Sequence, residues 1–355
     1  MPNTQDNGGR VDMPFVGIPS FLRSAICTDL DDLDAEIAIV GVPTDEGSPF
    51  MPGSRFGPRS IREHSLRFVT DPPGYYDPQA RRRYLEREMT AGRIADVGDA
   101  DILPTNVVDS FRNITDTVRT VLDRGAMPVL LGGDHAVTFP VVRAFEETGP
   151  LHVVHFDAHL DYMPFVHGLA YTNQHAFRHI RLMENVQRIT QVGIRSIRGS
   201  EVMLKDSLED GNRVVTMEEF RDVSPAGVIQ GIPEGARCYV SIDIDALDMS
   251  LVPGCVSAEP DGMSYRDLRD ALIVLAEHTE VVGFDLVEVN PQLDIATGIT
   301  SYLAAHTIIE FLGRICDQPR WVGARDARTG RREEVARRRA DSAEGAEPGG
   351  GEGDD

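Results

Sequence analysis

The chain has 355 residues, a formal net charge of −22 and 41% hydrophobic residues. This composition is typical of a soluble globular protein, and no apolar run reaches the roughly 20 residues that a membrane-spanning helix needs. The acidic charge, with Lys205 as the only lysine, argues against a surface that binds nucleic-acid phosphates. We therefore expect neither a nucleic-acid nor a membrane partner.

The N-terminal sequence and the cysteines bear on the compartment. The start, MPNTQDNGGRVDMPF, has neither the basic n-region nor the apolar h-region of a secretory signal. The cysteines lack CxxC spacing and the density of a disulfide scaffold, which favours reduced thiols. They are Cys27, Cys238, Cys255 and Cys316. We expect a cytoplasmic protein.

Apolar strand patterns and helical patterns alternate along the chain. Residues 1–20 are polar and contain several Gly and Pro residues, which predicts an N-terminal arm. Strand patterns follow at residues 35–43, 127–133, 151–159, 189–194, 213–217, 238–245 and 280–289. Helical patterns lie at 108–124, 265–278 and 301–312. Such alternation predicts an α/β protein whose parallel sheet has helices on both faces.

The domain organisation follows from composition. No change in composition divides the alternating series, so we expect a single domain over residues 21–324. Residues 75–92 have the pattern of a helical insertion before a strand or turn at 93–102. From residue 325 a basic stretch is followed by a Gly-rich acidic one, which predicts a disordered tail over 325–355.

Polar residues that directly follow the predicted strands form the candidate site, because ligands of open parallel sheets bind at the carboxyl ends of strands. Asp157, His159 and Asp161 end one strand, and their spacing of two places them on one face. Asp243 and Asp245 do the same at the end of another strand. Carboxylates in apolar surroundings are costly without a cation between them. We therefore expect a metal here rather than a solvated strand end.

The charge of this cluster predicts two metal ions. Asp157, Asp161, Asp243 and Asp245 would repel one another without a cation, whereas two divalent ions balance their charge. His135 follows a Gly-Gly turn that would be unremarkable alone, and with His159 it completes a mixed set of imidazole and carboxylate ligands.

Three neighbouring residues are expected to act differently. His155 shares the parity of Asp157 but lies deeper in its strand, so we expect a hydrogen-bonded core histidine. Asp134 is expected to orient a ligand from behind. Glu288 ends the strand at 280–289, and a carboxylate beyond a neutralised metal site is free to bind a small cationic substrate.

These motifs together resemble the ureohydrolase family of arginases and agmatinases, in its agmatinase or guanidino-acid hydrolase branch. The matching motifs are GGDH (132–135), DAHLD (157–161), SIDIDALD (241–248) and VEVNP (287–291), with PGSRFGPRSIRE (52–63) similar to a substrate-side loop and helix. The resemblance covers residues from about 35 to 313. It implies a three-layer α/β/α fold with a mostly parallel sheet, a homo-oligomer (trimer or hexamer), and hydrolysis of a guanidino compound to urea and an amine. The implied cofactor is a pair of Mn²⁺ ions, with Ni²⁺ as the alternative.

The resemblance also implies roles for individual residues. The residues that match metal ligands are His135, Asp157, His159, Asp161, Asp243 and Asp245. Glu288 matches the carboxylate that binds the guanidinium, and Ser257 keeps the hydroxyl of a threonine near the same group. Asp161 is also the candidate to accept a proton during hydrolysis, which makes Asp161 and Glu288 catalytic candidates.

Two loops depart from the family pattern. The family's HGTPFRR loop corresponds to YTNQHAFRHI (171–180), which places Asn173 where a histidine belongs. Asn173 is therefore a candidate to bind substrate. His175 is the candidate acid for the departing amine, with a loop hydrogen bond as the alternative role, and His167 could also replace the histidine. GTGTP becomes GCVSAEP (254–260), which puts Cys255 near the pocket. The altered loop leaves one alternative function, a non-catalytic or weakly active partner subunit in a hetero-oligomer.

Overall fold

The computed structural model describes residues 13–69 and 72–323, so the tail expected at 325–355 and the first part of the expected arm, residues 1–12, lie outside the described residues. Within the described part, nine strands form one sheet in the order β1-β5-β2-β6-β11-β10-β7-β8-β9. All its strand pairings are parallel. The strands are β1 (Ala25–Ile26), β2 (Ile37–Val42), β5 (Ile94–Asp99), β6 (Met127–Gly132), β7 (Leu151–Phe156), β8 (Val186–Ile194), β9 (Arg213–Thr216), β10 (Arg237–Asp243) and β11 (Glu280–Val287).

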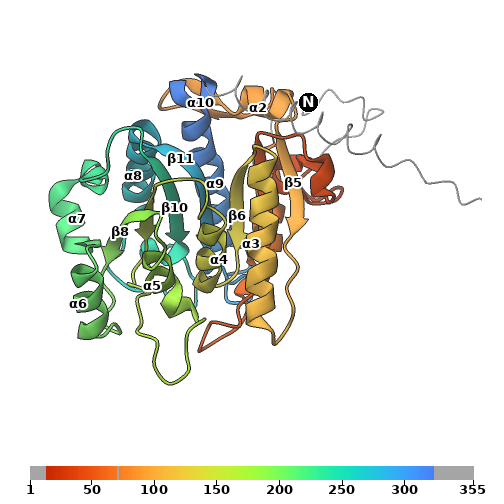
Figure 1. Ribbon diagram of the computed structural model, residues 1–355. Helices are drawn as coiled ribbons and strands as arrows, with labels where there is room; N and C mark the ends of the chain where they lie inside the picture. The colour runs from red at the N-terminus through yellow and green to blue at the C-terminus, as the bar shows by residue number, and fades with distance from the viewer. Residues whose placement is uncertain (1–12, 70–71, 324–355) are drawn as a thin grey trace, which may run out of the picture.

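Helices cover both faces of this sheet, which confirms the three-layer α/β/α prediction (Figure 1). The helices are α1 (Gly57–Ser65), α2 (Glu86–Thr90), α3 (Val107–Asp123), α4 (Thr138–Arg143), α5 (Ala176–Arg181), α6 (Glu201–Glu209), α7 (Met217–Val223), α8 (Tyr265–His278), α9 (Ile299–Cys316) and α10 (Pro319–Gly323). In Figure 1, α3, α4 and α5 lie in front of the sheet, and α8 and α9 lie behind it. No helix in the described ranges is long and apolar enough to span a bilayer.

The core is divided between the two faces of the sheet. On one face Phe284 of β11 packs against Phe311 of α9, with ring centroids 4.9 Å apart. On the other face Tyr239 of β10 packs against Phe145, with centroids 5.6 Å apart. Because both faces are covered, an inner strand such as β2 is buried at all of its positions. This explains why its sequence is a continuous apolar run rather than an alternating one.

The helical insertion predicted at residues 75–92 is mostly wrong. Its first part is an antiparallel hairpin of β3 (Tyr75–Asp77) and β4 (Arg82–Tyr84), and only the short α2 follows. The Asp77 carboxylate accepts hydrogen bonds from the backbone N–H groups of Gln79 and Ala80, which turns the chain. The Tyr75 and Tyr84 rings then stack 5.2 Å apart across the hairpin. This turn and cross-strand pair outweigh the helical propensity of the intervening residues.

Four adjacent strands at the centre of the sheet carry the candidate site. The order β6-β11-β10-β7 brings together segments that are far apart in the sequence. Since the strands are parallel, their carboxyl ends meet at one edge of the sheet. The four motifs that follow these strands therefore converge at that edge.

A tight turn after β6 fixes two parts of this edge. The carbonyl of Gly133 accepts from the Glu288 N–H at 2.8 Å, and the neighbouring Asp134 N–H donates to Thr44 O at 2.8 Å. A Cβ on Gly133 would lie 1.7 Å from the Thr44 carbonyl oxygen. Only glycine fits this approach of two backbones.

We expect Gly133→Ala to lower the free energy of unfolding by about 1–3 kcal/mol, because the methyl group must push the two backbones apart. Urea denaturation of the variant and the wild type measures this change. Gly199→Ala is the matched control, because a Cβ there would meet its nearest neighbour, Ser196 O, at 3.7 Å, which is ordinary contact. Equal unfolding midpoints for both variants would contradict the expected clash.

Candidate metal centre and active site

Short turns after the strands present the candidate ligands. The Asp134 side chain accepts the Ala136 N–H at 3.1 Å and so begins the 3-10 helix η5 (His135–Val137), which starts with His135. The Asp243 Oδ1 atom accepts the Asp245 N–H at 2.8 Å and begins η8 (Ile244–Ala246) in the same way. The first cap holds Asp134 and fixes the turn that begins with His135. The second cap holds Asp243 and fixes the position of Asp245.

Two site residues have a backbone conformation that is rare for side chains with a Cβ. Asp161 has φ 46° and Glu288 has φ 64°, both in the left-handed region. Such residues cost about 1–3 kcal/mol each and persist where the surrounding structure requires them. Their occurrence at both residues is consistent with a functional site.

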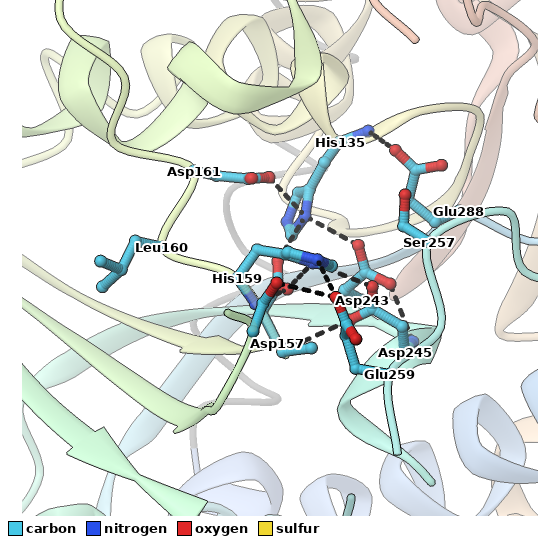
Figure 2. Close-up of polar contacts among 12 residues, drawn as sticks. His135, Asp157, His159, Leu160, Asp161, Asp243, Asp245, Ser257, Glu259 and Glu288 are labelled. Carbon is cyan, nitrogen blue, oxygen red and sulfur yellow. Dashed lines mark hydrogen bonds and ion pairs between the residues drawn. The ribbon is translucent and has the colours of Figure 1, made fainter. Parts of the chain in front are cut away.

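His135 faces three carboxylates. Its Nδ1 atom lies 3.0 Å from Asp157 Oδ2, 3.2 Å from Asp161 Oδ2 and 3.1 Å from Asp243 Oδ2. All four side chains are buried, and Figure 2 shows them converging between the strand ends. This cluster, His135 with its three carboxylates, is the first half-site.

A second half-site lies next to it. His159 Nδ1 lies 3.2 Å from Asp157 Oδ1 and 3.1 Å from Asp245 Oδ2. Asp157 therefore presents one oxygen to each histidine and joins the two half-sites. The six residues expected from the sequence as ligands are brought together in this arrangement.

The proton affinities show how much negative charge the site concentrates. Burial and neighbouring carboxylates raise the pKa of Asp161 to about 6 and the pKa of Asp243 well above its usual range. Burial alone would lower the pKa of His135, but its hydrogen bonds to the three carboxylates raise that pKa well above the usual value. Burial would also lower the pKa of His159, but the carboxylates of Asp245 and Asp157 outweigh this effect and raise that pKa to about 12. Positive charge is thus favoured at both histidine positions.

The residues present fit a pair of divalent cations. Each half-site offers one imidazole nitrogen and carboxylate oxygens 3.0–3.2 Å from it. Asp245 Oδ2 is buried and makes this ion-pair contact with His159 but no well-aligned hydrogen bond. Nitrogen and oxygen donors of this kind suit divalent ions such as Mn²⁺ and Ni²⁺. The cluster has more carboxylate oxygens than imidazole nitrogens. A cation in each half-site would bind the carboxylate oxygens that the imidazole rings cannot pair.

Hydrogen bonds behind His135 fix its orientation. Its Nε2 atom lies 2.9 Å from Ser241 Oγ, and that hydroxyl donates to Asp285 Oδ1 at 2.6 Å. Because the Ser241 hydroxyl hydrogen goes to Asp285, the Ser241 oxygen accepts a hydrogen bond from the Nε2–H group of His135. The Nδ1 lone pair is then free to face the first half-site, as a ligand requires.

A second chain of hydrogen bonds holds Asp157. Ser207 donates to Gln191 Oε1 at 2.7 Å, which leaves the Gln191 Nε2 amide near His155 Nδ1 at 3.1 Å. His155 Nε2 must then carry the hydrogen, and it lies 2.7 Å from Asp157 Oδ2. His155 is therefore a hydrogen-bonded core histidine, as expected, and its function is to position Asp157.

A pocket beside the half-sites contains the candidate substrate residues. Its lining includes Asp161, Asn173, Asp243, Ser257 and Glu288. Glu288 Oε1 accepts the His135 N–H at 3.0 Å and lies 3.4 Å from Asn173 Nδ2. Burial, followed by the charge of Asp134, raises the pKa of Glu288 to about 8. A bound cation would offset this cost, because it favours the ionised carboxylate.

The structure does not bring His175 to this pocket. Its Nδ1 atom lies 2.7 Å from Thr172 Oγ1, its ring stacks on Phe165, and its Nε2 is buried without a hydrogen bond. Burial lowers the pKa of His175. This geometry matches the loop hydrogen bond that the sequence left open as its alternative role.

Several residues of the site were not foreseen from the sequence. Ser241 and Asp285 lie inside predicted strands, where their polarity was the available signal. Arg198, which lines the pocket, comes from a loop that no local pattern marks. Glu259, whose Oε1 atom lies 3.6 Å from His159 Nε2, belongs to the altered segment 254–260, where it was given no role. Cys255 was expected near the pocket, and its sulfur lies within 4.8 Å of a carboxylate oxygen of both Asp243 and Asp245.

Comparisons with known proteins find similar chains over most of this sequence. The profile of the arginase family matches residues 35–313. The mitochondrial guanidino acid hydrolase of Homo sapiens is 33% identical over 303 residues, which cover 84% of this chain and 82% of that protein. Guanidinopropionase of Pseudomonas aeruginosa is 35% identical over 314 residues, which cover 84% and 92%. Among solved structures, proclavaminate amidino hydrolase of Streptomyces clavuligerus has a TM-score of 0.75 at 29% identity, and the match covers 85% of this chain and 98% of that one.

We expect Mn²⁺ at a hundred times its dissociation constant to raise the free energy of unfolding by about 2.7 kcal/mol per occupied half-site. Thermal unfolding with and without the ion measures this effect. Asp157→Asn should remove most of it, because this carboxylate joins both half-sites. The control is Asp116→Asn on α3, whose side chain is exposed. An undiminished response in Asp157→Asn would contradict a shared ligand.

Proposed function

The chain belongs to the arginase family, and on this premise we propose that it is a two-metal hydrolase that cleaves a C–N bond of a guanidino compound to give urea and an amine. The observation that supports this proposal most is the position of Asp157 between two imidazole rings, with one carboxylate oxygen directed to each. A single-metal hydrolase would not need four buried carboxylates and two histidines in one cluster.

The proposed ligands divide into two sets. His135, Asp161 and Asp243 would hold one ion and His159 and Asp245 the other, with Asp157 shared. When bound, the two cations would offset the carboxylate charge and make water a stronger nucleophile near neutral pH. Mn²⁺ is the ion we propose, with Ni²⁺ as the alternative, since both accept nitrogen and oxygen donors.

Glu288 is the proposed site of the substrate's guanidinium group. Its Oε1 atom is already held by the His135 N–H, which fixes the carboxylate relative to the first half-site. A guanidinium presents N–H groups in a planar fork, so a carboxylate can bind it through two charge-assisted hydrogen bonds. Asn173 and Ser257 line the same pocket and would bind the remaining polar edge of this group.

Asp161 is the proposed proton acceptor. Its carboxylate lines the pocket, and its Oδ2 atom faces the first half-site, 3.2 Å from His135 Nδ1. Its other oxygen, Oδ1, would take a proton as water adds to the guanidine carbon and pass it to the departing amine. Assembly into a trimer or hexamer and a cytoplasmic location stay predictions.

Urea release from a panel of guanidino compounds, measured with Mn²⁺ and then with Ni²⁺, tests the proposed reaction. We expect Glu288→Gln to lower kcat/KM by about a hundredfold to a thousandfold, because the buried charge partner of the substrate is lost. Glu280→Gln is the matched control, since Glu280 is an exposed residue at the start of the same strand, β11. Two bound metals without urea release from any substrate would instead favour the non-catalytic partner subunit.

His175→Asn separates the two roles left open for that histidine. An acid catalyst would lose about a hundredfold to ten-thousandfold in kcat. We expect less than a tenfold loss, with lower stability, because His175 contacts Thr172 rather than the pocket. Thr172→Val should lower stability in the same direction. A large loss of kcat in His175→Asn alone would return this residue to the catalytic set.

A further inference from the structure

Arg198 lines the pocket beside the half-sites. Among the described lining residues, it is the one whose side chain carries a permanent positive charge. The acidic side chains in the lining are Asp161, Asp243 and Glu288, which belong to the proposed metal and guanidinium sites. Arg198 lies in the loop between β8 and α6, and its side chain is 56% exposed. It therefore lies where the pocket opens to solvent.

One side of the Arg198 guanidinium is held by the protein. Its Nε atom donates to Glu259 Oε1 at 2.7 Å, and its Nη2 atom donates to the Ser257 carbonyl at 2.7 Å. Ser196 donates to the same Glu259 oxygen at 2.8 Å and keeps this carboxylate in place. The third nitrogen, Nη1, has no hydrogen-bond partner among the described residues. The guanidinium is thus positioned and still has donors to offer.

The contact between Arg198 and His159 depends on the imidazole tautomer. Arg198 Nη2 lies 2.9 Å from His159 Nε2, a hydrogen bond that requires Nε2 to accept. If His159 Nδ1 is a ligand, as proposed, Nε2 must carry the ring hydrogen and becomes a donor. Glu259 Oε1, at 3.6 Å, is the nearby acceptor for it. The two N–H groups of Nη1 are free in either tautomer, and they are the donors that Arg198 offers to the pocket.

We propose that Arg198 is a specificity residue that binds a carboxylate at the far end of the substrate, so that the enzyme prefers guanidino acids to guanidino amines such as agmatine. This assignment rests on the proposed function, in which Glu288 holds the guanidinium end. The free N–H groups of Nη1 can donate charge-assisted hydrogen bonds to a carboxylate.

The charges along the pocket decide between the two substrate classes. A guanidino acid presents a cation to Glu288 and an anion to Arg198, so both of its ends meet the opposite charge. Agmatine would present a second cation to Arg198. Glu259 does not reverse this preference, because its carboxylate is directed to Arg198, Ser196 and His159 and is not part of the pocket lining.

Three substrates of similar length test the assignment: guanidinobutyrate, with an anionic end, butylguanidine, with a neutral end, and agmatine, with a cationic end. In the wild type, kcat/KM should fall in that order. Arg198→Gln should lower the ratio of guanidinobutyrate to butylguanidine about tenfold to a hundredfold, mainly through KM, because charge-assisted hydrogen bonds are lost. Arg112→Gln, on the exposed face of α3, should leave the ratio unchanged.

Each other outcome has a definite meaning. An unchanged ratio in Arg198→Gln, or an equal loss with all three substrates, would overturn the assignment, since Arg198 would then act only through His159 or not at all. If the metal-loaded wild type released urea from none of them, the proposed function would fail. Calorimetric binding of guanidinobutyrate and butylguanidine to wild type and Arg198→Gln would then be decisive. The assignment would be supported if Arg198→Gln weakened the binding of guanidinobutyrate but not of butylguanidine. It would be overturned if the variant bound guanidinobutyrate as tightly as the wild type does.

Discussion

Buried negative charge around two imidazole rings is the interaction on which the arrangement of this molecule depends. Three carboxylate oxygens lie 3.0–3.2 Å from His135 Nδ1, and Asp157 carries the cluster on to His159. Burial, followed by the charges of Asp245 and Asp157, raises the pKa of Asp243 well above its usual range and so favours its protonation. Two bound cations would remove that penalty. The proposed metal pair thus accounts for a cluster that would otherwise destabilise the fold.

The sheet and its hydrogen bonds hold this cluster in place. Four parallel strands end at one edge, and polar residues within β10 and β11, Ser241 and Asp285, fix the His135 ring from behind. The same edge carries Glu288, and the pocket continues from there to Arg198. The pocket thus contains the carboxylates proposed to bind metal, the carboxylate proposed to bind a guanidinium, and one basic group. Such a combination of charges suits a substrate that is cationic at one end and anionic at the other.

The sequence predicted seven of the nine strands of the sheet, but not the short edge strand β1, and it left β5 as a strand or a turn. It also predicted a parallel sheet and the convergence of the six candidate ligands, because each lies at a short fixed distance after an apolar run. It did not predict the hairpin at Tyr75–Tyr84, where an Asx turn and a tyrosine pair outweigh helical propensity. Arg198 was missed because the role proposed for it depends on contacts with a loop about 60 residues away. His175 was placed in the catalytic set by its loop, whereas its burial against Phe165 is a tertiary feature.

The central claim is that Asp157 is shared by two metal ions. An anomalous-difference map from crystals of the protein grown with Mn²⁺ tests it most directly, because it locates each ion without assuming its ligands. The account predicts two peaks, one beside His135 Nδ1 and one beside His159 Nδ1, with the Asp157 carboxylate between them. A single peak, or peaks that Asp157 does not contact, would contradict it.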